Sequence, residues 1–230
     1  MSDSKDPTCA LCGLRMSQKI CFTAEGKGME NCPTLNADDI IEEANQEYEK
    51  PDIHEFARLA SVQEGECYLD RERKPYLPHC GKTRIQEICE FAGKIGAKKL
   101  GLAFCVGLSK EARMVHDIFA GQGFEVVSVV CKVGRQSKEN ALGVEDREKI
   151  MIGSDEAACN PILQAKILNR AGTDLNVLLG LCVGHDSLFL KYATAYSTVL
   201  AVKDRVTGHN PLAALYTSHS YYKFMKRKDF

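Results

Sequence analysis

The sequence predicts an α/β fold: a small parallel sheet with flanking helices, preceded by a cysteine-rich metal knuckle and a helical segment. Two observations support this prediction. After residue 98, apolar runs of strand length alternate with segments whose apolar residues recur at helical spacing, as a parallel sheet requires. The 230 residues also suffice for one α/β core and a small appended module. We therefore divide the chain into a leader, residues 1–35, and a second part, residues 36–230, whose sheet begins at about residue 98.

Each element of the second part has a local signal. Acidic residues open a helix over 36–49, where they suit the helix dipole, Pro51 starts a second helix, and Thr83 leads a third. The predicted strands are residues 99–105, 124–131, 175–182 and 198–203, and the helices among them are 110–120, 161–169, 187–195 and a short one from Pro211. The polar segment 132–158 exceeds normal loop length, so we expect it to be partly helical, over 144–152, or to form a lid.

Composition and charge limit the classes of function. The formal net charge of -1 gives no electrostatic reason for nucleic acid or an anionic membrane as the main partner. No apolar stretch approaches the roughly 18 to 20 residues that span a bilayer, and the polar residues 1–6 lack the apolar core of a signal peptide. We therefore expect a cytoplasmic protein. Its eleven cysteines indicate metal binding or thiol chemistry, because a reducing cytosol disfavours structural disulfides.

The leader holds four cysteines in a stretch with too few apolar residues for a core of its own. Cys9 and Cys12 form a Cys-x-x-Cys pair that can place two thiolates on one ion, and Cys21 and Cys32 can complete a tetrahedral set. A bound metal would supply the folding free energy that the core cannot. A typical zinc ribbon has two such pairs, and Cys32-Pro33 resembles the end of some iron–sulfur motifs, so zinc and a cluster both stay open. The alternative is a leader whose cysteines have no role.

Four more cysteines are predicted to meet at one edge of the sheet. Cys105, Cys131 and Cys182 each end an apolar run, and the carboxyl ends of parallel strands share the edge at which ligands bind. Cys159 precedes Asn160-Pro161, a helix cap followed by proline at the first helical position, so it should lie at the mouth of a helix. Any one of these cysteines could equally be a small buried apolar residue. Their combination predicts a shared metal or cluster site.

Other residues at this edge are candidates for cofactor binding. Gly107 and Gly184 allow the backbone to approach a bulky group, and His185, Asp186 and His209 lie nearby. Four thiolates around a cavity that needs glycines suit an iron–sulfur cluster better than a bare zinc ion.

The motifs resemble those of an uncharacterised family of cysteine-rich, predicted metal-binding proteins, a domain of unknown function found largely in anaerobic bacteria and archaea. The resemblance covers most of the chain and implies metal binding, but no reaction. It rests on the Cys9-x-x-Cys12 leader, residues 103–108, Cys159-Asn160-Pro161, residues 180–189, Lys203-Asp204-Arg205 and His209-Asn210-Pro211.

Three functions are compatible with these patterns. The first is an iron–sulfur redox or electron-transfer protein, with a redox partner protein or small molecule and a second, N-terminal metal site. The second is a cysteine-dependent enzyme in which Cys182 is the nucleophile and His185 or His209 its base, arranged by Asp186. The third is a non-catalytic zinc sensor or carrier. Three further residues are harder to place and are interpreted as structural, because buried free cysteine is common: Cys67, His79 and Cys80.

Overall fold

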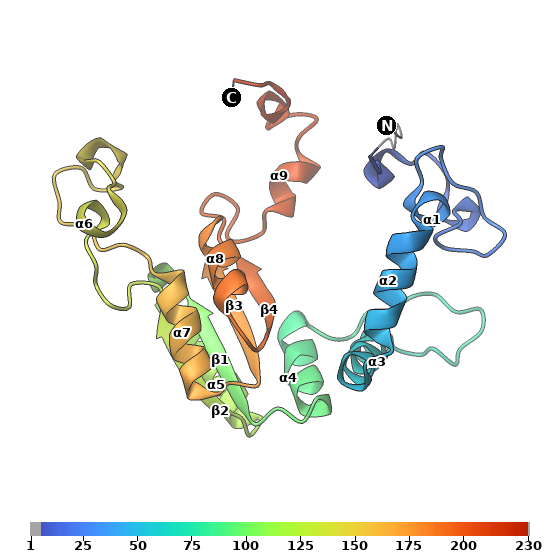
Figure 1. Cartoon of the computed structure of the whole chain (residues 1–230), viewed down its shortest axis with the longest axis horizontal. Coiled ribbons are helices and arrows are strands. Elements are labelled where there is room, and N and C mark those ends of the chain that lie inside the picture. Colours follow the sequence, from blue (N-terminus) through green and yellow to red (C-terminus); the bar gives the residue numbers. More distant parts are fainter. Residues whose placement is uncertain (1–5, 230) are drawn as a thin grey trace. The chain divides into compact units, whose positions relative to one another are not determined.

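The computed structural model describes residues 6–229, and the chain divides into two compact units between Gly65 and Glu66 (Figure 1). None of the helices in this described range combines the length and apolar character needed to cross a lipid bilayer.

The first unit consists of short helical turns followed by two longer helices. Its elements are η1 (Cys9–Leu11), η2 (Met16–Gln18), α1 (Pro33–Asn36), α2 (Asp38–Tyr48) and α3 (Pro51–Glu66). Asp38 and Asp39 occupy the first turn of α2, as predicted from the helix dipole. Within residues 6–65, Gln63 is the one fully buried residue, so this unit lacks an apolar core in its described part.

The second unit contains a sheet of four parallel strands in the order β2-β1-β3-β4. The strands are β1 (Lys99–Phe104), β2 (Glu125–Val130), β3 (Leu175–Leu181) and β4 (Tyr196–Val202). All seven residues of β3 are buried, as expected of a central strand that is covered on both faces. The predicted α/β class is thus confirmed.

Helices cover both faces of this sheet (Figure 1). They are α4 (Arg84–Lys94), α5 (Ser109–Gly121), α7 (Pro161–Ala171) and α8 (His185–Tyr192). On one face Phe119 of α5 packs with Ile88 of α4, and on the other Phe189 of α8 packs with Leu168 of α7. α8 begins and ends earlier than the predicted 187–195. Its early start follows from Gly184, whose positive φ of 82° turns the chain so that the helix begins at the next residue, His185.

The remaining short elements lie in the connections. They are η3 (Val106–Leu108), α6 (Lys138–Leu142), η4 (Asp146–Glu148), α9 (Leu212–Tyr216) and η5 (Lys223–Lys226). The segment 132–158 is partly helical, as expected, but its α-helix precedes the range 144–152 that we predicted.

Candidate functional site

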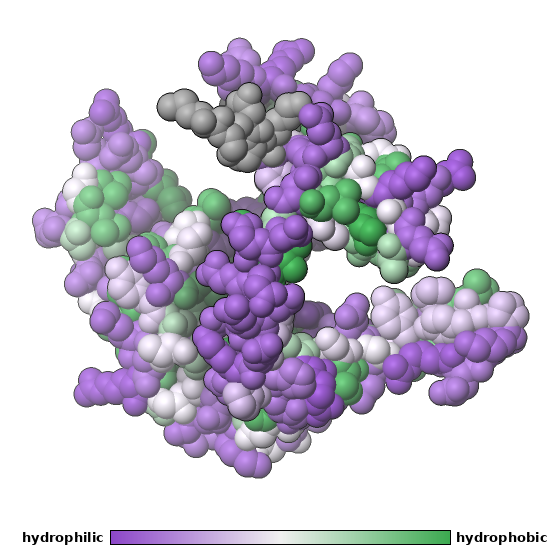
Figure 2. Space-filling model, turned by 45° about the vertical axis from the view of Figure 1, so that its right-hand side comes forward, coloured by the Kyte–Doolittle hydropathy of each residue, from purple (hydrophilic) through white to green (hydrophobic). Residues whose placement is uncertain are grey.

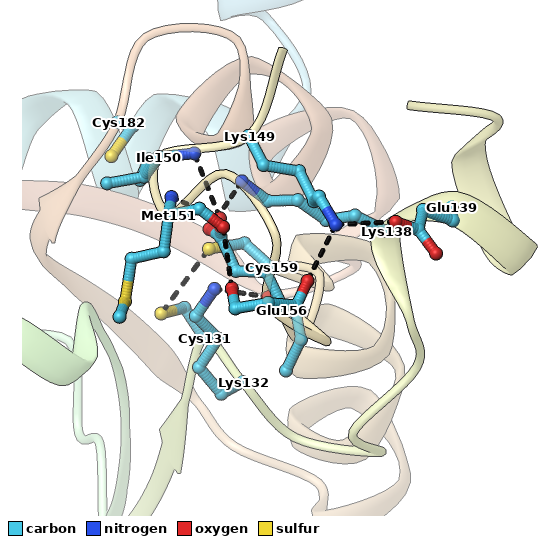
Figure 3. Close-up of polar contacts among 12 residues, drawn as sticks. Cys131, Lys132, Lys138, Glu139, Lys149, Ile150, Met151, Glu156, Cys159 and Cys182 are labelled. Carbon is cyan, nitrogen blue, oxygen red and sulfur yellow. Dashed lines mark hydrogen bonds and ion pairs between the residues drawn. The ribbon is translucent and has the colours of Figure 1, made fainter. Parts of the chain in front are cut away.

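Two of the cysteines that were predicted at the sheet edge lie in direct contact. The Sγ atoms of Cys131 and Cys159 are 3.7 Å apart and share a hydrogen bond (Figure 3). The backbone N–H of Val106 donates to Cys131 Sγ at 3.3 Å. Cys131 is only 3% exposed, whereas Cys159 is half-buried. We refer to Cys131 and Cys159 as the thiol pair.

Backbone hydrogen bonds explain why residues 28 positions apart meet here. The N–H of Cys131 donates to Phe104 O at 2.8 Å, which continues the pairing of β1 with β2 for one residue beyond the strands. The N–H of Asn160 then donates to Cys131 O at 2.7 Å, and the Asn160 side chain caps α7 by accepting from the Leu163 N–H at 2.9 Å. These bonds join the start of α7 to the end of β2. Cys131 directly follows β2, and Cys159 directly precedes the N-cap of α7.

The intervening segment 132–158 is ordered by ion pairs. Lys138 and Glu156 form a salt bridge of 2.6 Å, with their side chains 17% and 12% exposed. The second carboxylate oxygen of Glu156 accepts from the N–H groups of Ile150 and Met151 at 2.9 and 3.2 Å (Figure 3). Lys149, whose side chain is 2% exposed, pairs with Asp146 at 2.6 Å and with Glu139. These contacts hold the segment together and bring its two ends to the thiol pair.

The environment separates the acidities of the two thiols. The hydrogen bond with Cys131 and the positive charges of Lys132 and His185 lower the pKa of Cys159 to about 5, although burial acts in the opposite direction. The hydrogen bond with Cys159 and burial raise the pKa of Cys131. The surroundings therefore favour the thiolate form at Cys159 and the neutral thiol at Cys131. Lys132, which sequence reasoning missed, is fixed by a hydrogen bond from its Nζ to Ala157 O.

The other two predicted ligands at this edge have different surroundings. The half-buried Cys105 is close enough to Cys131 for its charge to contribute to the raised pKa of Cys131. Cys182 lies apart from the thiol pair (Figure 3), and its Sγ accepts a hydrogen bond from Arg205 Nη2 at 3.1 Å. Arg205 is a second residue that site prediction overlooked, although it stands in a Lys-Asp-Arg run at the tip of the last strand.

The predicted cofactor-binding residues mostly serve the turns in which they lie. A Cβ on Gly107 would be 3.9 Å from Cys105 Sγ, an ordinary contact, so this position is not crowded. Asp186 accepts from the N–H of the next residue at 2.8 Å. His209 Nδ1 accepts from the Asp204 N–H at 3.1 Å, and the His209 N–H donates back to Asp204 O at 2.8 Å. His209 thus closes the loop after β4.

The four cysteines of the leader line one pocket of about 90 Å³: Cys9, Cys12, Cys21 and Cys32. Turn η1 places the first two on one turn, with the Cys12 N–H donating to Cys9 O at 3.2 Å. The Asn31 side chain donates to Asp6 O at 2.7 Å and to Thr8 Oγ1 at 2.9 Å, which joins the first pair of cysteines to the residue before the fourth. We call this the leader pocket.

The close approach of Gly28 to Cys32 shapes the wall of the leader pocket. A Cβ on Gly28 would lie 2.9 Å from Cys32 Sγ and 2.7 Å from its Cβ, so glycine leaves the space that the thiol occupies. Among residues 6–229, however, no three or more His, Cys, Asp or Glu side chains have the geometry to hold one metal ion. The four thiols share a pocket without being arranged as a ligand set.

Comparison with known proteins gives the family. A sequence profile described as "Protein of unknown function (DUF1847)" matches residues 32–200, most of the chain. The chain belongs to the DUF1847 family. An uncharacterized protein of Methanocaldococcus jannaschii is 40% identical over 212 residues, which cover 92% of this chain and 97% of the relative. The DUF1847 match includes all four sheet-edge cysteines, but of the leader pocket cysteines it includes Cys32 alone.

Proposed function

We propose that this DUF1847 protein is a metal-binding protein whose leader pocket holds one zinc or iron ion through Cys9, Cys12, Cys21 and Cys32. The observation that supports this proposal is that all four thiols line the same pocket although they are spread over 24 residues, from 9 to 32. Thiolates are the ligands that these ions prefer in tetrahedral protein sites. The proposal agrees with the metal binding that the family resemblance implies.

Folding energetics support the same proposal. The described part of the first unit lacks an apolar core, since Gln63 is its one fully buried residue. Structural zinc sites commonly supply the folding free energy that such small units lack. Metal binding would draw the four sulfurs inward to about 2.3 Å from the ion. A pocket of about 90 Å³ provides room for that contraction.

The iron–sulfur cluster predicted at the sheet edge stays a prediction. It requires four thiolates around one centre. Cys131 and Cys159 have a separation of 3.7 Å, close to the ~3.8 Å between two sulfurs on one tetrahedral metal. Cys105 and Cys182 would have to join them, and Cys182 would have to leave Arg205. The leader pocket needs no such exchange of partners, so we favour it as the metal site.

Metal and acid-labile sulfide analysis of anaerobically purified protein tests the proposal. We expect about one zinc or iron per chain in the wild type, and loss of that metal in Cys12→Ser and Cys32→Ser. Cys80→Ser, which alters an exposed cysteine outside both groups, is the matched control and should keep the metal.

Two results would contradict the proposal. The first is full metal content in both leader variants. The second is iron and sulfide that are lost in Cys159→Ser but kept in Cys12→Ser and Cys32→Ser, which would place the metal at the sheet edge instead.

A further inference from the structure

We infer that Cys131 and Cys159 form a thiol–disulfide exchange site that reacts with low-molecular-weight disulfides. This activity is separate from the metal site proposed in the leader pocket. The two sulfurs are 3.7 Å apart, and a disulfide requires about 2.05 Å, so they must approach by about 1.7 Å. The hydrogen bond from the Asn160 N–H to Cys131 O already fastens the two backbones side by side at this point. Only the two side chains must therefore move to bring the sulfur atoms within bonding distance.

The structure gives the two cysteines different roles in the exchange. Cys159 is half-buried and directly precedes the N-cap of α7, where the helix dipole favours a thiolate. Lys132, held by its bond to Ala157 O, supplies a positive charge next to it (Figure 3). Cys131 is 3% exposed, so it is less accessible to solvent than the half-buried Cys159. An incoming disulfide can therefore meet Cys159 first, and Cys131 is placed to complete the reaction.

The reaction balances without a further oxidant. The Cys159 thiolate attacks one sulfur of a disulfide RSSR, the S–S bond of RSSR breaks, and RS⁻ leaves, so that a mixed disulfide forms on Cys159. Cys131 then loses its proton to the solvent and attacks Cys159 Sγ, which expels the second RS⁻. The two cysteines are oxidised to a disulfide, and RSSR is reduced to two RSH once the leaving thiolates take up protons. The reverse sequence with excess RSH restores the thiol pair.

The surface around the thiol pair is open to a small molecule. Val106, whose N–H contacts Cys131 Sγ, is itself 48% exposed. Two apolar side chains of the ion-paired segment, Ile150 and Met151, are also exposed, at 78% and 64%. Apolar rims of this kind can bind the carbon chains of a disulfide while its sulfurs meet Cys159.

Glutathione redox buffers provide the test on the full chain. Reduced protein is equilibrated in buffers of increasing oxidised-to-reduced glutathione ratio, quenched with an alkylating agent and mapped by peptide mass spectrometry. We expect the Cys131–Cys159 disulfide to form as the ratio rises, with a loss of two titratable thiols per chain. Excess reduced glutathione should reverse it.

Three variants make the test specific. Cys131→Ser should accumulate glutathione on Cys159, because the second step is blocked. Cys159→Ser should leave Cys131 unmodified, because the first step is blocked. Cys80→Ser should behave like the wild type, and circular dichroism should show that each variant is folded.

The inference is overturned if the wild type forms no Cys131–Cys159 disulfide at any ratio. It is also overturned if Cys131→Ser takes up no more glutathione on Cys159 than Cys159→Ser does on Cys131. The outcome is independent of the leader pocket. Cys12→Ser should undergo the same exchange, so loss of metal in that variant tests the proposed function and leaves this inference unaffected.

Discussion

Lys132 should control the pH at which Cys159 becomes reactive. The hydrogen bond with Cys131 lowers the pKa of Cys159 to about 5, and the positive charge of Lys132 contributes to the same effect. At pH 6 such a thiol is about 90% thiolate, whereas an ordinary thiol of pKa ~8.5 is roughly 0.3% thiolate. Thiolates of lower pKa are intrinsically weaker nucleophiles, by about 40-fold for this difference. The two effects together predict that at pH 6 Cys159 reacts with iodoacetamide about sevenfold faster than the cysteine of an unstructured peptide with a thiol pKa of ~8.5.

The assay is the rate of Cys159 alkylation between pH 4 and pH 9, followed by peptide mass spectrometry on reduced, chelator-treated protein. For the wild type the rate should level off above about pH 6. Lys132→Met should move the midpoint upward by about one pH unit or more, because a neighbouring positive charge no longer favours the thiolate. Lys166→Met, on the exposed face of α7, is the matched control. A wild-type midpoint near pH 8.5, or identical profiles for the two lysine variants, would refute the reasoning.

Two further perturbations test how the fold supports the sheet edge. Gly180 has φ 64°, and a Cβ there would lie 2.1 Å from Leu108 Cδ1, so Gly180→Ala should lower the free energy of unfolding by about 3 kcal/mol in urea denaturation. Gly121→Ala, where a Cβ meets nothing within 4 Å, should instead raise it by about 0.5 kcal/mol, and equal effects would contradict the packing argument. The hydrogen bond with Lys138 lowers the pKa of Glu156, so its stabilising contribution is complete above about pH 4.3 and is lost as the pH falls through the lower folded-state value. The amide protection factors of segment 132–158, which are intrinsic rates divided by observed exchange rates, should therefore fall over that range, and those of Glu156→Gln should be low at every pH. Protection factors in the wild type that do not change over this range would argue against the role of Glu156.

The strands were predictable because their signal is local. Residues 175–182 form an apolar run that only Asn176 interrupts, and all of β3, Leu175–Leu181, is buried. Cys131 follows such a run, and Cys159 precedes the start of a helix. In a parallel α/β sheet, strand ends and the starts of the following helices share one edge, which is why the meeting of Cys131 with Cys159 could be expected from sequence. The family resemblance, too, rested on these local motifs.

The interactions that distinguish the cysteines from one another were not predictable. The ion pair of Lys138 with Glu156 joins residues with no shared periodicity, and it orders a segment that reads as a polar loop. The contact of Arg205 with Cys182 depends on how the loop after β4 turns back toward β3. His209 was predicted as a cofactor residue because the segment His209-Asn210-Pro211 was expected near the sheet edge; its Nδ1 accepts a hydrogen bond from the backbone of its own loop.

The most direct test of the proposed metal site is X-ray absorption spectroscopy at the zinc and iron edges of the protein as purified without air. We predict four sulfur neighbours at about 2.3 Å around a single ion. The same spectrum should appear for Cys159→Ser, and it should disappear for Cys32→Ser. A first shell of nitrogen and oxygen, or a metal–metal vector that vanishes in Cys159→Ser, would contradict the leader pocket as the metal site.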